Sequence, residues 1–144
     1  MPPGTGHLVI TTLAHSDSCA VLRVSGDLDY ASELSFMAAL GDAVDAGYRY
    51  LVLDVTALVF CDSRGLNCLL ALRWLLHRRP GALLLVHVGR RLTALLAQTG
   101  STDLFPSFLT VRHALETVPE SSRPVWPPTA DATAAPSGEQ DSGS

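Results

Sequence analysis

Residues 51–70 read LVLDVTALVFCDSRGLNCLL, and this stretch decides the fold class. The β-branched, aromatic and aliphatic run over residues 50–55 predicts a buried parallel strand. Ser63 then opens a segment, lasting to about Arg79, in which apolar side chains recur at helical spacing and which Pro80-Gly81 ends. A buried strand that leads through a short loop into a helix is the unit from which α/β sheets are built.

The chain before this unit predicts a β-hairpin. Two apolar runs, Leu8–Ala14 and Ala20–Ser25, flank the polar cluster His15-Ser16-Asp17-Ser18, which suits a tight turn. In the second run the side chains alternate in character, which indicates a strand with one buried face. The segment Gly26-Asp27-Leu28-Asp29 then leaves the sheet.

Periodicity also predicts three further helices. The first runs from Ala31 to Ala46, with Gly47 as its stop, and its apolar stripe comprises Leu34, Met37, Leu40 or Ala38, and Val44. The others are expected over residues 90–99 and, capped by Thr110, to about Val118; strands are expected over 82–88 and near 107–109. The whole order predicts an α/β fold: a mixed β-sheet entered through an N-terminal hairpin, followed by alternating helices and strands.

One domain over residues 8–118 accounts for these elements, after an N-terminal extension of residues 1–7. Beyond Pro119 the chain is rich in Pro, Ala, Ser and acidic residues, and Trp126 is its only large apolar side chain. Such a composition buries too little apolar surface to offset the entropy of ordering. We therefore predict a disordered tail over residues 119–144.

The overall composition excludes several classes of protein. The chain has 144 residues, 47% of them hydrophobic, and a mean hydropathy of +0.25, which indicates a folded body. Its net charge is −4 and its ten basic residues are mostly isolated, so no basic stripe is available to bind nucleic acid directly. No apolar run reaches the length of a membrane span, and the N-terminus lacks a signal-peptide pattern, so we expect a cytoplasmic protein without a membrane partner.

The sequence gives little indication of a metal site, a bound cofactor or catalytic residues. Cys19, Cys61 and Cys68 lie in apolar runs without a C-x-x-C pair, and we interpret them as reduced core residues. The histidines are too scattered to propose a metal site, and we expect no cofactor. Neither a G-x-S-x-G elbow nor a glycine-rich phosphate loop follows a strand, so we expect no catalytic residues and no enzyme activity.

The pair Asp62-Ser63 lies between the predicted strand and the start of the predicted helix. Ser63 can occupy the N-cap position while Gly65 keeps the first turn open, and taken alone this makes Ser63 a helix cap. Arg64 is either a solvated cation or a group that guides a partner or pairs with a phosphate. Asp29 is either the cap of the first helix or part of a partner surface, and the two roles are compatible if the carboxylate stays partly exposed.

A second apolar ridge, formed by Leu66, Leu70 and Trp74, runs along the helix that begins at Ser63. A helix that is apolar on more than one face needs a cover. We expect a neighbouring helix of the same domain to supply it, with a partner or a second copy as the alternative.

The run LVLDVTALVFCDSRGLNCLL resembles the STAS domain family, whose bacterial anti-sigma factor antagonists carry Asp-Ser-x-Gly-Leu directly after a strand. Gly26-Asp27-Leu28-Asp29 and TGSTDLFPSF match the family in the same order, so the resemblance covers about residues 8–118 and implies the STAS fold. Arg64 and Asn67 depart from the pattern, because the family often has a small residue and a glycine at these positions.

The resemblance also implies a function. In the family, the serine that matches Ser63 is phosphorylated by an anti-sigma factor that is also an ATP-dependent serine kinase. The unphosphorylated chain is then expected to bind that anti-sigma factor, which frees a sigma factor for transcription, and phosphorylation of Ser63 is expected to release it. A phosphoserine phosphatase would reset the cycle. The expected partner-binding residues are Asp29, Asp62, Ser63, Arg64 and Gly65.

Two other functions stay open at this point. The chain is alternatively a STAS subunit of a sensory signalling scaffold, or a nucleotide-binding STAS module. As an antagonist, we expect it to be a monomer or a weak homodimer. A phosphate of charge about −1.5 to −2 at the N-terminus of a helix is compatible with the fold. A partner that packs over Ser63 would be repelled by the same charge.

Overall fold

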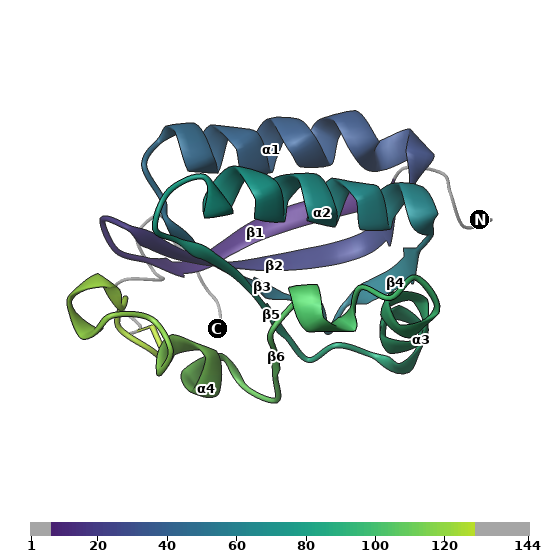
Figure 1. Cartoon of the computed structure of the whole chain (residues 1–144). Helices are drawn as coiled ribbons and strands as arrows, with labels where there is room; N and C mark the ends of the chain where they lie inside the picture. Colours follow the sequence, from purple (N-terminus) through teal and green to yellow (C-terminus); the bar gives the residue numbers. More distant parts are fainter. Residues whose placement is uncertain (1–6, 129–144) are drawn as a thin grey trace, which may run out of the picture.

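The computed structural model describes residues 7–128, and a six-stranded mixed sheet lies at its centre (Figure 1). Its strands are β1 (Leu8–His15), β2 (Cys19–Leu28), β3 (Tyr50–Asp54), β4 (Leu58–Cys61), β5 (Ala82–Val86) and β6 (Ser107–Phe108). β1 pairs antiparallel with β2, and all other pairings are parallel. The spatial order is β1-β2-β3-β5-β6, with β4 beside β2. This confirms the predicted mixed sheet with a hairpin at its start.

Helices cover both faces of the sheet. They are α1 (Glu33–Asp45), α2 (Ser63–His77), α3 (Arg90–Gln98) and α4 (Val111–Leu115), with the 3₁₀ turns η1 (Tyr30–Ser32), η2 (Thr102–Leu104) and η3 (Glu120–Ser122). α1 and α2 lie side by side on one face, and α4 lies on the other (Figure 1). Gly47, in the left-handed region at φ 106°, follows the end of α1 as predicted.

The sheet separates two apolar cores. Because successive residues of a strand point to opposite faces, Leu51 and Leu53 enter the core beneath α1 and α2, while Val52 enters the core beneath α4. β2 contributes to both cores and is buried on both faces from Cys19 to Leu22. The prediction of a single buried face for this strand was wrong, because helices pack on both faces of the sheet over this part of β2.

Of the apolar stripe predicted for α1, Leu40 is buried and Met37 and Val44 pack against the core, but Leu34 does not. Phe36 and Leu40 are fully buried, whereas Leu34 is 84% exposed. Positions two apart in a helix point about 200° away from each other, so Leu34 and Phe36 cannot both face the core. The larger side chain, that of Phe36, is the one that faces it.

β4 was not predicted. We expected its last residues, Phe60 and Cys61, to form a loop, but they pair in parallel with the C-terminal part of β2, where Cys61 lies opposite Leu28. β2 is ten residues long and β3 only five, so the end of β2 extends past β3 and offers a free edge for β4. The helix α2 therefore begins after β4 and not directly after the buried strand β3.

Residues 119–128, which we predicted to begin the disordered tail, pack against the domain. The hydroxyl of Ser16 donates to the backbone oxygen of Ser122, and Trp126 packs against the core beneath α4. The prediction was wrong for this stretch because the Trp126 ring supplies apolar surface that the rest of the tail lacks. Residues 129–144 and most of the predicted N-terminal extension lie outside the described residues.

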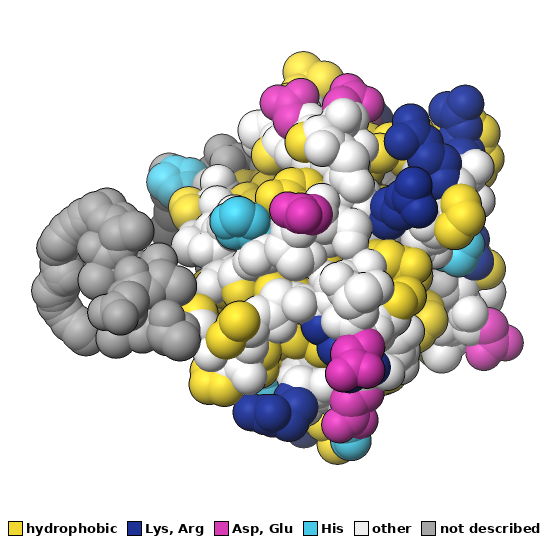
Figure 2. Space-filling view, turned by 90° about the vertical axis from the view of Figure 1, so that its left-hand side faces the viewer, with side chains coloured by type: hydrophobic (Ala, Val, Ile, Leu, Met, Phe, Trp, Pro, Cys, Tyr) yellow, Lys and Arg dark blue, Asp and Glu magenta, His cyan; other side chains and the backbone are white. Residues whose placement is uncertain are grey.

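The predicted ridge on α2 is covered only in part. Leu66 is buried in the core, and Leu70 packs partly against it, but Trp74 is 62% exposed. The guanidinium of Arg78 lies 5.0 Å from the centroid of the Trp74 ring. Figure 2 views the molecule from the end where α2 terminates, and arginine side chains gather along one side of this face. Exposed Arg78 and Arg79 follow α2 in the chain.

The helices of the described chain are short. α2 is the longest, with 15 residues. Within residues 7–128 no helix combines the length and the apolar character that crossing a bilayer requires.

Candidate functional site

The candidate site lies at the carboxyl ends of β2 and β4, where α2 begins. β2 and β4 are parallel neighbours, and Leu28 and Cys61 lie opposite each other in the ladder. The residues that follow them, Asp29 and Asp62, therefore emerge at the same edge of the sheet. Crevices outside the carboxyl ends of parallel strands are where open α/β sheets most often bind their ligands.

Asp62 is the N-cap of α2, and this corrects the prediction for Ser63. The Asp62 carboxylate accepts a hydrogen bond from the Gly65 backbone N–H at 2.9 Å, and its backbone oxygen accepts from the Leu66 N–H at 2.9 Å. Ser63 is the first residue inside the helix and is exposed. Within residues 7–128, no side chain or backbone group is hydrogen-bonded to the Ser63 hydroxyl. The hydroxyl is free for chemistry because a neighbour performs the capping.

Gly65 is required by a close approach of two backbones. A Cβ atom at this position would collide with the backbone oxygen of Leu28 and lie 2.9 Å from the Cys61 sulfur. Gly65 is buried, so α2 starts directly against the end of β2. This contact sets how far the first turn, and with it Ser63, stands out from the sheet.

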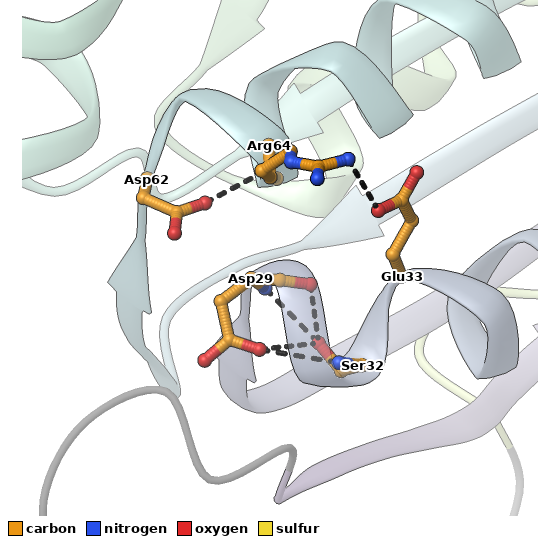
Figure 3. Close-up of polar contacts among 6 residues, drawn as sticks. Asp29, Ser32, Glu33, Asp62 and Arg64 are labelled. Atoms are coloured by element: carbon orange, nitrogen blue, oxygen red, sulfur yellow. Dashed lines mark hydrogen bonds and ion pairs between the residues drawn. The ribbon is translucent and has the colours of Figure 1, made fainter.

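Asp29 is buried, with 1% of its surface exposed, so the expectation of a partly exposed carboxylate was wrong. Its Oδ1 accepts a hydrogen bond from the Ser32 backbone N–H at 3.1 Å, while the Asp29 N–H donates to the Ser32 hydroxyl at 3.0 Å (Figure 3). This reciprocal pair is a capping box, and it fixes η1 at the entrance to α1. The other carboxylate oxygen, Oδ2, is buried without a hydrogen-bond partner among the described residues. The cap role of Asp29 is therefore observed, and any effect on a partner is indirect.

Arg64 is not a freely solvated cation. Its guanidinium forms an ion pair with Glu33, with 3.3 Å between Nη1 and Oε1, and lies 4.8 Å from the centroid of the Tyr30 ring. Figure 3 shows Arg64 extending from the first turn of α2 toward Glu33 at the start of α1. Two elements that are distant in the sequence are thus joined beside Ser63.

Exposed apolar side chains lie on the elements that border Ser63. Tyr30 in η1 is 69% exposed, Leu34 in α1 is 84% exposed and Val59 in β4 is 66% exposed. They are three of the seven exposed large apolar side chains among the described residues. An apolar surface of this kind beside a free hydroxyl is typical of a protein interaction site.

The cysteine nearest to the site is not a nucleophile. Burial, together with the nearby charges of Asp62 and Asp29, raises the pKa of the Cys61 thiol to about 12. Burial likewise raises the pKa of Cys68 to about 11 and that of Cys19 to about 12. All three thiols are free in the structure. Among the described residues, no cluster of three or more His, Cys, Asp or Glu side chains could hold a metal ion.

The structure brings four of the predicted site residues, Asp62 to Gly65, together at the first turn of α2. The fifth, Asp29, is the buried N-cap of the turn η1. Sequence reasoning missed Tyr30, Glu33 and the exposure of Leu34. Nothing local in the sequence signals that Glu33 pairs with Arg64, because the two residues are 31 positions apart.

Comparison with known proteins agrees with this geometry. The family model described as "STAS domain" matches residues 11–114. An anti-sigma factor antagonist from Mycobacterium paratuberculosis has a similar solved structure, with 30% sequence identity and a TM-score of 0.62, covering 76% of this chain and 94% of that one. No curated protein matched the sequence.

Two further solved structures share the fold. The anti-sigma factor antagonist SpoIIAA in its unphosphorylated form is 19% identical, with a TM-score of 0.65, and covers 77% of this chain and 95% of that one. The Bacillus cell fate determinant SpoIIAA in its phosphorylated form is 18% identical, with a TM-score of 0.60, and covers 78% and 99%. At this level of identity the similarity concerns the fold alone.

Proposed function

The chain belongs to the STAS domain family, and from this membership we propose that it is an anti-sigma factor antagonist controlled by phosphorylation of Ser63. In its unphosphorylated form it binds an anti-sigma factor that has serine kinase activity, and this frees a sigma factor for transcription. Phosphorylation of Ser63 ends the binding, and a phosphoserine phosphatase restores it. The chain itself acts in the cytoplasm as a substrate and binding partner, without catalysis of its own.

The observation that carries the proposal is the free and exposed hydroxyl of Ser63 at the first position of α2. A kinase needs a hydroxyl that it can reach and that the fold does not require. Asp62 caps the helix through its bond to Gly65, so Ser63 meets both conditions. The helix N-terminus, with its unpaired N–H groups and positive dipole end, also tolerates the negative charge of a phosphate.

The surroundings of Ser63 suit a protein partner. Exposed Tyr30, Leu34 and Val59 offer apolar contact area, and Arg64 and Glu33 offer polar contacts. Tyrosine and arginine are enriched among the residues that dominate binding energy at interfaces. We place the partner on this surface, in direct contact with Asp62, Ser63 and Arg64. The buried residues Gly65 and Asp29 contribute by holding the first turn of α2 and η1 in place.

A phosphate at Ser63 would weaken such a complex through charge, bulk and desolvation. It would add a charge of about −1.5 to −2 beside the Asp62 carboxylate, at a place that the partner covers. Weakening the affinity by two to four decades corresponds to about 3–5.5 kcal/mol, which a few lost contacts and one buried dianion can supply. SpoIIAA, which shares the fold, has been solved in both an unphosphorylated and a phosphorylated form, so the fold can carry a phosphate.

The test compares the affinity of four chains for the purified anti-sigma factor kinase of the same organism. Ser63→Ala should bind as tightly as the original chain, and Ser63→Glu should bind at least tenfold more weakly. Ser121→Glu is the matched control, because Ser121 is an exposed serine in η3, far along the chain from α2. Incubation with ATP followed by mass spectrometry should place the phosphate on Ser63. Equal affinity of all four chains, or a phosphate on another residue, would contradict the proposal.

A further inference from the structure

Arg64 joins two parts of the proposed partner surface. Its guanidinium pairs with Glu33 at 3.3 Å and lies over the Tyr30 ring at 4.8 Å from the centroid. The Arg64 side chain is 53% exposed and that of Glu33 34% exposed. Ion pairs that are exposed to this degree contribute little free energy, because solvent screens them and side-chain entropy opposes them. The contact can therefore be exchanged for a stronger one at small cost.

A phosphate on Ser63 would be such a competitor. Ser63 and Arg64 are consecutive, so their Cα atoms are about 3.8 Å apart. Adjacent side chains leave a helix about 100° apart, but the long arginine stem can span this angle to reach a phosphate. The phosphate carries up to about twice the charge of the Glu33 carboxylate and accepts two parallel hydrogen bonds from a guanidinium.

Along the first part of α2, Arg64 has no competing cation. Arg64 is the only basic residue between Asp62 and Arg73, and the Arg73 Nε donates to the backbone oxygen of Leu104 at 2.6 Å. The Asp62 carboxylate is negative and is engaged with Gly65. The remaining donors for a phosphate are backbone N–H groups of the first turn of α2, which can bind it together with Arg64.

We propose that Arg64 is the internal receptor of a phosphate on Ser63, and that its capture separates Arg64 from Glu33 and Tyr30. The effect of phosphorylation then extends from the first turn of α2 to η1 and the start of α1. Glu33 loses its positive partner, and the face of the Tyr30 ring is uncovered, so the surface changes at two places besides Ser63. This inference rests on the proposed phosphorylation of Ser63 and concerns how that modification acts.

Arg64 is thus a specificity-determining residue of this chain. A partner adapted to the unphosphorylated chain would contact Arg64 in its position over Tyr30, and would lose that contact together with the free serine.

The test uses the isolated chain with phosphoserine introduced at position 63 during synthesis, so neither kinase nor partner is needed. Phosphorus NMR then follows the second pKa of the phosphoserine, which is ordinarily near 6. Removing a cation that binds the dianion should raise this pKa, by about half a unit in Arg64→Ala, and Arg64→Lys should restore it in part. Glu33→Gln should lower it, because the carboxylate no longer competes for Arg64. Arg79→Ala is the matched control: Arg79 is exposed and lies beyond the far end of α2, about 24 Å away at 1.5 Å per residue, so it should leave the pKa unchanged.

A second readout follows the Tyr30 ring by NMR. Phosphorylation should move the ring resonances toward their positions in unphosphorylated Arg64→Ala, because in both cases the guanidinium leaves the ring. A phosphate pKa that is the same with and without Arg64 would overturn the inference, and so would a Tyr30 ring that phosphorylation leaves unchanged. Both results are independent of whether an anti-sigma factor binds, so they separate this inference from the proposed function.

Discussion

The Asp62 carboxylate accepts a hydrogen bond from the Gly65 N–H at 2.9 Å, directly beside a serine whose hydroxyl is free. The cap and the proposed phosphorylation site are thus adjacent residues. If Ser63 were itself the cap, phosphorylation would alter the group that holds the first turn together. With Asp62 as the cap, the surface can change its charge while α2 keeps its N-terminus.

The two residues should therefore differ in their contribution to stability. Asp62→Ala removes the cap and should lower the free energy of unfolding by about 1 kcal/mol. Ser63→Ala removes an exposed, unpaired hydroxyl and should change it by less than about 0.5 kcal/mol. Urea denaturation of the two variants measures the difference, and a larger loss for Ser63→Ala would show that the cap is misassigned.

Gly65→Ala should be strongly destabilising. The new methyl group would meet the backbone oxygen of Leu28, which cannot move without disturbing β2, so we expect a loss of about 2 kcal/mol or more. Gly41→Ala is the control, because Gly41 lies inside α1 with no atom within 4 Å of a Cβ, and there alanine should stabilise by up to about 1 kcal/mol. Calorimetry should find shifts of opposite sign, and a neutral Gly65→Ala would argue against the close approach of α2 and β2.

Asp54 should make stability depend on pH in the acid range. Burial disfavours its charged form, but hydrogen bonds from Thr56 and the ion pair with Arg23, at 3.2 Å, outweigh burial and lower the pKa of the carboxyl. A lowered pKa stabilises the folded chain fully above the ordinary value of about 3.9, and this stabilisation is lost as the pH falls through the folded-state pKa.

Asp54→Asn should accordingly weaken the fold near pH 7, by about 1–3 kcal/mol, and flatten the decline of stability below about pH 4. Denaturation at a series of pH values measures both effects. If the original chain and Asp54→Asn lost stability in parallel below pH 4, the carboxyl of Asp54 would not have a lowered pKa.

The three cysteines should resist thiol reagents in the folded chain. With the pKa of Cys61 near 12, only about one thiol in ten thousand is ionised at about pH 8, and the thiolate is the reactive form. Labelling should be slow until the chain unfolds, after which all three should react. Rapid labelling of Cys61 in the native chain would indicate that the first turn of α2 opens.

Two truncations test where the domain ends. We propose that the folded unit extends beyond the predicted boundary at Val118, because Trp126 packs against the core beneath α4. Removal of residues 129–144 should leave the melting temperature unchanged within about 2 °C, whereas removal from Pro119 onward should lower it by several degrees. If both truncations melted alike, the contacts of the segment 119–128 would contribute nothing to stability.

Much of the fold could be predicted because its signals are local. The run from Tyr50 to Asp54 is a strand, the residues after Ser63 form a helix, and Gly47 follows the end of α1, as the sequence indicated. Each of these depends on the side chains of one short segment, on their spacing and on whether they are apolar. The position of Ser63 at the N-terminus of a helix follows from the same local pattern.

The errors concern contacts between distant segments. β4 is only four residues long, and it forms because β2 extends past β3. The sequences of β2 and β3 do not show this difference in length. The choice of Phe36 over Leu34 for the core depends on how α1 sits on the sheet, since a helix with both residues has two possible apolar faces. Asp62 and Ser63 are both residue types that cap helices well, and only the structure shows that the Asp62 carboxylate accepts from the Gly65 N–H.

The sequence by itself determined the alternation of strands and helices and the serine at the start of α2, because hydrophobic periodicity and turn residues act over a few positions. The family was indicated by the resemblance of the motif around Ser63. Only the tertiary structure decided that Asp29 is buried, that Asp62 leaves the Ser63 hydroxyl free, and that Arg64 lies over Tyr30 and pairs with Glu33, which is 31 positions away in the sequence. These contacts arise from the packing of α1 and α2 on one sheet, and packing depends on which faces meet in space.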